Sequence, residues 1–218
     1  MTTAVTVLPV LPEDVVTDLE DRVRLAVTGG YDRADELVAG LIELVEYDPA
    51  TEDGVARNRD EVVAAIQRMV DRRMAEHAAA EGLFPSTTDC DRLTAAFGRL
   101  EADGVLARED VGYTQSDVRD EMWELVDRTR AEERSPRGWV AFHRQDVERA
   151  VDSGVLYISF ASVSDDDDGF RAIGAEVVAA LTDVGLTVDW DGDPNRRVEL
   201  VGLRWQKRRR RSNPRRAR

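Results

Sequence analysis

The hydrophobic pattern of this chain changes once, at the polar segment 131–137. Before this segment, apolar residues recur at intervals of three and four, which is typical of amphipathic helices. After it, short apolar runs such as VLYISFA (155–161) alternate with short helical patterns. The segment itself is charged and broken by Pro136, and such composition favours a linker. The pattern predicts a helical domain over 1–130, a linker over 131–137 and a small α+β domain over 138–206.

Five helices are expected in the first 130 residues. Proline, glycine and capping residues bound helices at 12–27, 32–47, 59–80, 89–103 and 116–130, with a short strand at 105–108. Helix, turn, helix and strand over 58–110 have the layout of a winged helix. However, residues 86–110 hold six acidic side chains against three arginines, and a DNA reader should present positive charge to phosphates. We therefore expect a structural or protein-contact role for this winged-helix-like segment.

The C-terminal domain shows the order β-α-β-α-β-β. Strands are expected at 139–142, 154–161, 186–190 and 197–203, and helices at 144–152 and 169–184. Such an order predicts a compact α+β sandwich with helices covering one sheet face. The acidic loop 164–168 partly matches a calcium loop, but the twelfth position is Ala175, so we interpret Asp168 as the cap of the following helix.

Charge is distributed unevenly between the body and the end of the chain. Residues 207–218 read KRRRRSNPRRAR and carry eight positive charges, whereas the preceding 206 residues hold 22 basic and 44 acidic side chains. We expect a disordered Arg-rich tail, because like charges repel and nothing apolar can be buried. Three hypotheses remain for the tail: it is untethered, it binds nucleic acid or another polyanion, or it returns to acidic residues of its own chain.

Several classes of protein are disfavoured by what the sequence lacks. Cys90 is the single cysteine, so neither an intramolecular disulfide nor a thiolate metal cage is expected. No secretory signal and no apolar run of about 20 residues is present, which predicts a cytoplasmic protein without membrane contact. There is no glycine-rich phosphate loop, nucleophile elbow or HExxH pattern, so we expect no cofactor and no metal.

The densest polar cluster is FHRQDVER (142–149). His143 stands at the end of a predicted strand, with Asp146 and Glu148 in the following helix, and a histidine beside carboxylates could perform acid–base chemistry or bind a metal. Asp146 could instead be the N-cap of the helix and Glu148 a partner of the helix dipole, or the residues could form an ion pair. Asp191 and Asp193 could join them, although VDWDGDPNRRV (188–198) is more typical of a hairpin turn.

Two segments together resemble a known family. TTDCDRLTAAFGRLEADGV (87–105) and the region from GWVAFHRQDVERAV to VDWDGDPNRRV (138–198) are similar to an actinobacterial family known only as a domain of unknown function. The resemblance covers most of 58–206 and implies a bacterial cytosolic protein of no established activity. In similar proteins a cysteine-rich stretch implies a small metal site with the equivalent of Cys90, but residues 111–117 of this chain contain no cysteine.

Two functional hypotheses follow. The first is a non-enzymatic protein-interaction or regulatory module, whose acidic faces favour a basic partner or a nucleic-acid-binding enzyme; nucleic acid itself would contact only the tail. The alternative is a small hydrolase or metal-assisted enzyme centred on His143, with Asp146, Glu148 and Asp191 as its other groups. This alternative requires those side chains to converge on one point.

Overall fold

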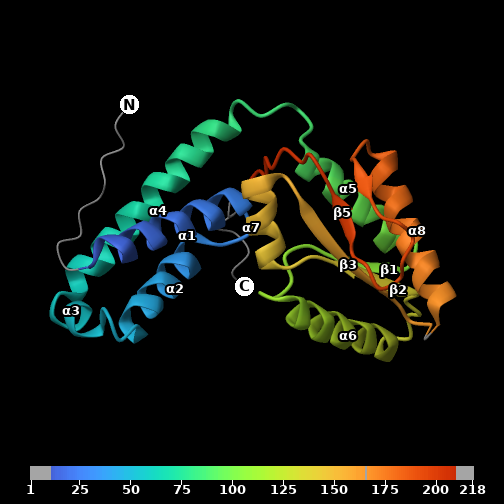
Figure 1. Ribbon diagram of the computed structural model, residues 1–218, viewed down its shortest axis with the longest axis horizontal. Helices are drawn as coiled ribbons and strands as arrows, with labels where there is room; N and C mark the ends of the chain where they lie inside the picture. The colour runs from blue at the N-terminus through green and yellow to red at the C-terminus, as the bar shows by residue number, and fades with distance from the viewer. Residues whose placement is uncertain (1–10, 165, 210–218) are drawn as a thin grey trace. The chain divides into compact units, whose positions relative to one another are not determined.

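A computed structural model describes residues 11–164 and 166–209, and the chain forms two compact units (Figure 1). Unit 1 comprises residues 11–84 together with Arg208 and Arg209, and unit 2 comprises residues 85–207. The mixture of helices with one five-stranded sheet confirms the predicted α+β class. Within the described residues, 11–164 and 166–209, no helix is both long enough and apolar enough to cross a membrane.

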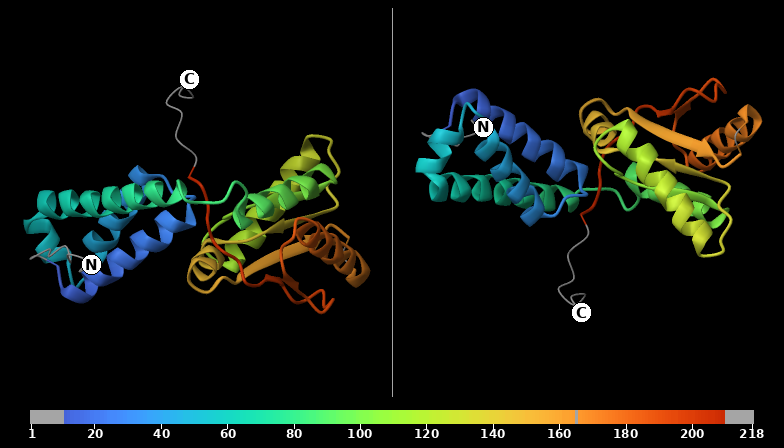
Figure 2. Two further views of the ribbon diagram at one scale, coloured as in Figure 1. Left: turned by 90° about the horizontal axis from the view of Figure 1, so that it is seen from above. Right: turned by 90° about the horizontal axis from the view of Figure 1, so that it is seen from below.

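Unit 1 is helical, as its 3.6-residue periodicity predicts. It contains α1 (Glu13–Gly29), α2 (Ala34–Tyr47), α3 (Glu52–Arg57) and α4 (Arg59–Glu81), and α4 packs against both α1 and α2 (Figure 2). The helices bury a cluster of valine, leucine, isoleucine and methionine side chains that includes Leu19, Val23, Ile66 and Met69. α1 ends at Gly30, whose φ of 86° lies in the left-handed region that favours glycine.

Unit 2 confirms the predicted order β-α-β-α-β-β as β2-α7-β3-α8-β4-β5. Its elements are α5 (Asp89–Ala102), β1 (Val105–Arg108), α6 (Gln115–Ala131), β2 (Gly138–Ala141), α7 (Arg144–Ser153), β3 (Leu156–Ser162), α8 (Asp167–Asp183), β4 (Val188–Asp189) and β5 (Val198–Leu200). β4 and β5 form the expected antiparallel hairpin around the 191–197 turn. Asp166, rather than the predicted Asp168, caps α8, because its Oδ1 accepts a hydrogen bond from Gly169 N at 2.6 Å.

The sheet has the strand order β1-β2-β3-β5-β4, in which only the β1–β2 pair is parallel. Parallel neighbours need a long crossover, and α6 with the segment 132–137 supplies it. Arg137 fastens the end of this segment: its N donates to Gly104 O at 2.8 Å, and its guanidinium bonds both carboxylate oxygens of Glu176 at 2.7 and 2.6 Å. The segment predicted as a linker, 131–137, is therefore a connection inside unit 2.

The segment 58–110, predicted to be winged-helix-like, is divided between the two units. Its first helix, α4, belongs to unit 1, whereas α5 and β1 belong to unit 2. β1 pairs in parallel with β2, and this pairing joins it to the sheet of the α+β module. The sequence pattern described the elements but not their partners, because strand pairing depends on residues beyond position 110.

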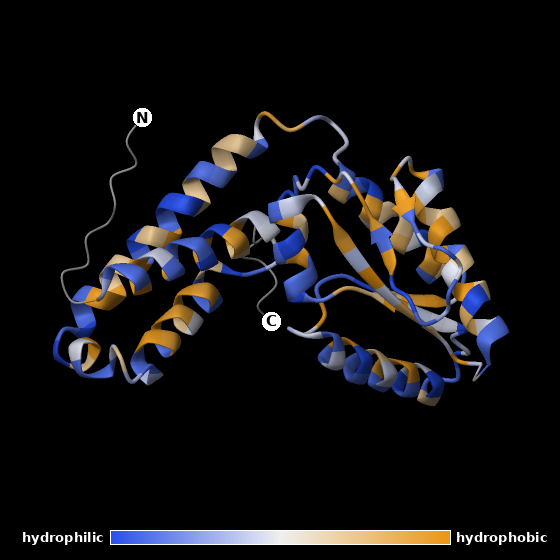
Figure 3. Ribbon diagram, in the orientation of Figure 1, coloured by the Kyte–Doolittle hydropathy of each residue, from blue (hydrophilic) through white to orange (hydrophobic). Residues whose placement is uncertain are grey.

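Helices cover both faces of the sheet, which corrects the expectation of one covered face. On one face lie α5 and α8, where Phe97 meets Phe142 with ring centroids 5.7 Å apart. On the other face α6 packs over β2, and Figure 3 shows apolar residues along the strands. This second face buries Leu106, Val118, Met122, Val126, Trp139, Ala141 and Ala161.

The first residues of the predicted basic tail make specific contacts. Lys207 forms an ion pair with Glu109 in unit 2. In unit 1, Arg209 N donates to Glu81 Oε1 at 2.6 Å, and the Arg209 guanidinium donates to the carbonyl oxygens of Val27, at 2.9 Å, and Asp32. These contacts support a return to the chain's own acidic residues for 207–209, in place of disorder. Residues 210–218 lie outside the described part of the chain.

Candidate functional site

His143 begins α7 as its N-cap residue. Its Nδ1 accepts a hydrogen bond from Asp146 N at 3.3 Å, and Asp146 Oδ2 accepts one from His143 N at 3.3 Å. This reciprocal pair is a capping box, which satisfies two backbone N–H groups at the helix start. The structure therefore gives the cluster 142–149 a capping role, with His143 as the N-cap in place of the expected Asp146, which is the N3 residue of the capping box.

Arg197 completes the cluster around Asp146. Its Nη1 donates to both carboxylate oxygens of Asp146, at 3.0 and 3.1 Å, and the Asp146 side chain is 3% exposed. The Arg197 guanidinium also stacks on the Tyr157 ring, with its central carbon 4.6 Å from the ring centroid. The three side chains come from α7, β3 and the segment before β5, so they tie these elements together.

Burial controls the ionisation of this cluster. It lowers the pKa of His143, because a charged imidazole would lose its hydration, while Asp146 acts in the opposite direction. Burial also raises the pKa of Asp146, against the opposing effect of Arg197. Since Nδ1 accepts a backbone hydrogen bond, we assign the imidazole proton to Nε2, which lies 3.0 Å from Asp146 Oδ2. A neutral, buried histidine in this position orients the helix start.

The predicted site residue Asp191 bonds within its own turn and not to His143. The carboxylates that act on the pKa of His143 are those of Asp146, Asp117 and Asp110. Glu148 lies half-buried on α7, and half-exposed Asp191 accepts hydrogen bonds from Asp193 N at 3.0 Å and Arg196 Nη1 at 2.7 Å. Across residues 11–164 and 166–209, no three His, Cys, Asp or Glu side chains are grouped so that they could hold a metal ion.

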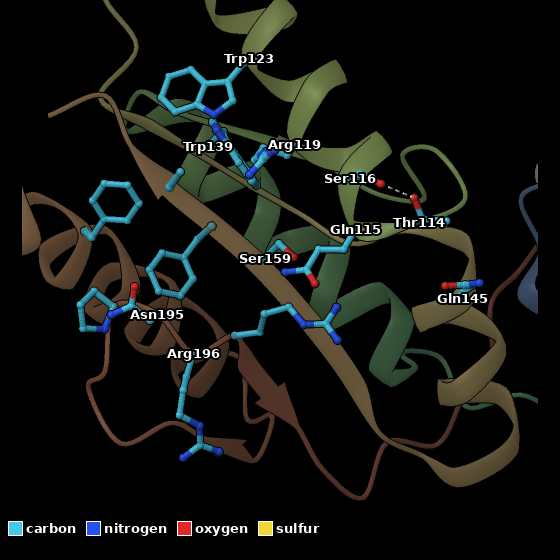
Figure 4. Close-up of a pocket in the computed structure, with 15 residues that line it drawn as sticks. Thr114, Gln115, Ser116, Arg119, Trp123, Trp139, Gln145, Ser159, Asn195 and Arg196 are labelled. Atoms are coloured by element: carbon cyan, nitrogen blue, oxygen red, sulfur yellow. Dashed lines mark hydrogen bonds between the residues drawn. The ribbon is translucent and has the colours of Figure 1, made fainter. Parts of the chain in front are cut away.

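A groove of about 880 Å³ opens beside α6 on the sheet face that this helix partly covers (Figure 4). α6 and the turn before it form one wall, the segment 194–197 forms the other, and β2 and β3 form the floor. Figure 4 shows Ser159 at the centre of the groove, with Gln115 reaching toward it from α6. The lining residues are Thr114, Gln115, Ser116, Arg119, Trp123, Trp139, Gln145, Ser159, Phe160, Ala161, Phe170, Pro194, Asn195, Arg196 and Arg197.

The lining of the groove contains three arginines and no Asp or Glu, although the whole chain carries a net charge of −14. Arg196 pairs with Asp191 and Glu199, and Arg197 pairs with Asp146. Arg119 forms no ion pair with any residue in the described ranges. The groove therefore presents one uncompensated positive charge on a protein that is acidic as a whole.

Two polar groups on the floor of the groove lack hydrogen-bond partners. Trp139 and Ser159 are 4% and 6% exposed, and neither Trp139 Nε1 nor Ser159 Oγ has a partner within the described part of the chain. Buried polar groups are nearly always hydrogen-bonded, and each one left unsatisfied costs about 1–3 kcal/mol. Both groups line the same groove, where they could donate hydrogen bonds to an acceptor.

Sequence reasoning did not find this groove. Its polar residues come from α6 and the turn before it, α7, β2, β3 and the turn before β5, so no single stretch of sequence contains them. Trp139, Ser159 and Arg119 read as ordinary strand and helix residues until strand pairing brings them together.

A family model described as Domain of unknown function (DUF6891) matches residues 12–209. The chain belongs to this family, which confirms the resemblance to an uncharacterised family and extends it over the N-terminal helices. No curated protein and no solved structure matches the chain.

Proposed function

We propose that this member of the DUF6891 family is a non-enzymatic interaction protein whose unit 2 groove receives an acidic segment of a partner protein. One observation carries the proposal: the groove lining has three arginines and no carboxylate in a chain of net charge −14. Charge complementarity favours an acidic occupant and speeds its association. A basic partner that binds acidic surfaces outside the groove is a separate hypothesis.

The shape of the groove also supports this proposal. Its volume of about 880 Å³ and its open form suit a short stretch of polypeptide laid across the sheet. Aromatic side chains at one end offer apolar contact, and the amides of Gln115, Gln145 and Asn195 can hydrogen-bond a peptide backbone. These features serve recognition and need no reacting group.

The enzymatic hypothesis centred on His143 ranks second. Arg197 favours it to a limited degree, because this residue both contacts Asp146 and lines the groove. A hydrolase at this position would use His143 as its base, so His143→Asn would abolish turnover on any substrate found. The interaction proposal requires no such loss, because asparagine is a good N-cap.

The test selects phage-displayed random peptides on the full-length protein and measures their affinities for two charge-reversed variants. Arg119→Glu changes the groove, and Arg128→Glu is the matched control, because both arginines are exposed on α6 and lie nine residues apart, on opposite sides of the helix. We expect the selected peptides to be acidic. Their Kd should rise at least about tenfold with Arg119→Glu and no more than about twofold with Arg128→Glu. Peptides that bind both variants equally well would contradict the proposal.

A further inference from the structure

We infer that the floor of the groove is a binding site for a single carboxylate that is attached to an apolar group. This inference rests on the proposed function and names the chemistry that the groove recognises. The carboxylate would accept hydrogen bonds from Trp139 Nε1 and Ser159 Oγ and would pair with Arg119.

The register of the sheet places the two floor residues on one face. Trp139 pairs with Ala161, and Ala141 pairs with Ser159, so Trp139 and Ser159 are diagonal neighbours whose side chains leave the same side of the sheet. The indole N–H is a donor only, and the serine hydroxyl can also donate. A group with two acceptor oxygens is what can satisfy both donors at once.

The charge of the site favours a monoanion. Arg196 and Arg197 already pair with carboxylates of the protein. The third arginine of the lining, Arg119, has no carboxylate partner among the described residues. One uncompensated positive charge neutralises one carboxylate. A phosphate monoester, which carries nearly two negative charges at pH 7, would bring excess charge into a partly buried site.

Trp123 packs against Trp139 in the groove. Its ring packs edge-to-face on Trp139, with centroids 6.4 Å apart and planes at 90°. Trp139 Nε1 and Ser159 Oγ each expose less than 1 Å² to solvent, so our inference requires side chains over the floor, such as the half-buried Trp123, to move before a ligand oxygen reaches them. Arg119 precedes Trp123 by one helical turn on the same side of α6, where it can hold the carboxylate as the ring moves.

Apolar contact is available next to these donors. Trp123 and Phe170 both line the groove and are only partly buried. An apolar group that is covalently linked to the carboxylate would lie against these rings. The inferred recognition unit is therefore an acidic side chain with an apolar neighbour in a partner, or a free aryl carboxylate of the same chemistry.

The experiment follows the indole N–H signals of the full-length protein by ¹H–¹⁵N NMR during titration with three probes. The probes are 3-phenylpropionate, its neutral amide and phenyl phosphate, and Trp139→Phe identifies the Trp139 signal. For a ligand of this size we expect 3-phenylpropionate to shift that signal with a Kd on the order of 1–10 mM. The amide and phenyl phosphate should bind at least about tenfold more weakly.

Variants test the named donors. Arg119→Gln should weaken 3-phenylpropionate binding at least about fivefold and Ser159→Ala at least about threefold, whereas Arg128→Gln should leave it unchanged. The inference is overturned if phenyl phosphate or the amide binds as tightly as the carboxylate, or if no probe shifts the Trp139 signal at about ten times the expected Kd.

The two proposals fail in different ways. If acidic peptides lose affinity with Arg119→Glu but 3-phenylpropionate does not shift the Trp139 signal, the interaction proposal stands and the carboxylate inference is wrong. If 3-phenylpropionate binds through Trp139 but no peptide is selected, the carboxylate site stands as a small-molecule site and the interaction proposal is wrong.

Discussion

The Arg197 guanidinium joins both carboxylate oxygens of Asp146, a residue 51 positions earlier in the chain. The pair connects the start of β5 to the first turn of α7, and Asp146 at the same time closes the capping box with His143. Asp146, which the sequence placed in a candidate catalytic cluster with His143, thus connects α7 to the start of β5 through Arg197. Arg197 also lines the groove, so the same contact positions one of its walls.

Loss of Arg197 should destabilise unit 2. In Arg197→Met the buried carboxylate of Asp146 loses its cation, and we expect a loss of about 3 kcal/mol in the free energy of unfolding. Arg196→Met is the matched control, because the exposed Arg196–Asp191 pair should be worth less than about 1 kcal/mol. Urea unfolding followed by tryptophan fluorescence reports on unit 2, since all four tryptophans lie in 85–207. Equal losses in the two variants would show that burial does not matter here.

The stability of unit 2 should fall as the pH drops below neutrality. Burial lowers the pKa of His143 in the folded state, so between the unfolded value of about 6.5 and the lower folded value only the unfolded chain binds the proton. Protonation therefore favours unfolding in this window, and the raised pKa of Asp146 acts with the opposite sign. We expect His143→Asn to reduce the fall in the urea midpoint between about pH 7.5 and 5.5. An unchanged fall would assign it to other groups.

Arg208 and Arg209 should stabilise the end of α1. Arg209 donates to the Val27 carbonyl, in the last turn of α1, where carbonyl groups lack partners within the helix. A chain that stops after Lys207 should exchange the amides of this turn at least about tenfold faster than a chain that stops after Arg209, which corresponds to about 1.4 kcal/mol. Hydrogen–deuterium exchange with mass spectrometry measures the difference. Identical exchange in the two truncated chains would mean that the contacts do not stabilise unit 1.

Cys90 should be inert in the folded protein. Its side chain is buried, and this burial raises the pKa of the thiol to about 12. Because the thiolate is the reactive form, we expect Ellman's reagent at about pH 8 to label native Cys90 at least about 100-fold more slowly than the urea-unfolded chain. Fast labelling of the native protein would place Cys90 at an accessible surface and restore it as a candidate ligand or nucleophile.

Local patterns were sufficient for most of the elements. The helix expected at 59–80 is α4 (Arg59–Glu81), and the six elements after residue 137 occur in the predicted order. Errors began where an element needed a distant partner. Val105–Arg108 was expected to belong to the helical region, yet its neighbour in the sheet is β2, beyond the supposed linker. Arg137, which precedes β2, also pairs with Glu176 on α8, and no local pattern reports this contact.

The candidate site shows the same division. A helix cap among residues 143–146 could be predicted from sequence, because a capping box spans only four residues, but the sequence indicated Asp146 and not His143 as the N-cap. Asp191 could not be placed, since its contact with Arg196 depends on the shape of the turn. The groove, with Trp139 and Ser159 lacking hydrogen-bond partners, could not be predicted from the sequence, because these residues become neighbours only when β2 and β3 pair in one register.

The sequence by itself determined where helices and strands lie, the class of the fold, the acidic body and the basic end, because periodicity, capping and charge are local properties. The tertiary structure decided the sheet order, the division after Phe84, the contacts of residues 207–209 and the carboxylate-free groove. The physical reason is that strand pairing and burial join residues far apart in the chain. Whether a polar atom finds a partner is settled only when all of its neighbours are in place.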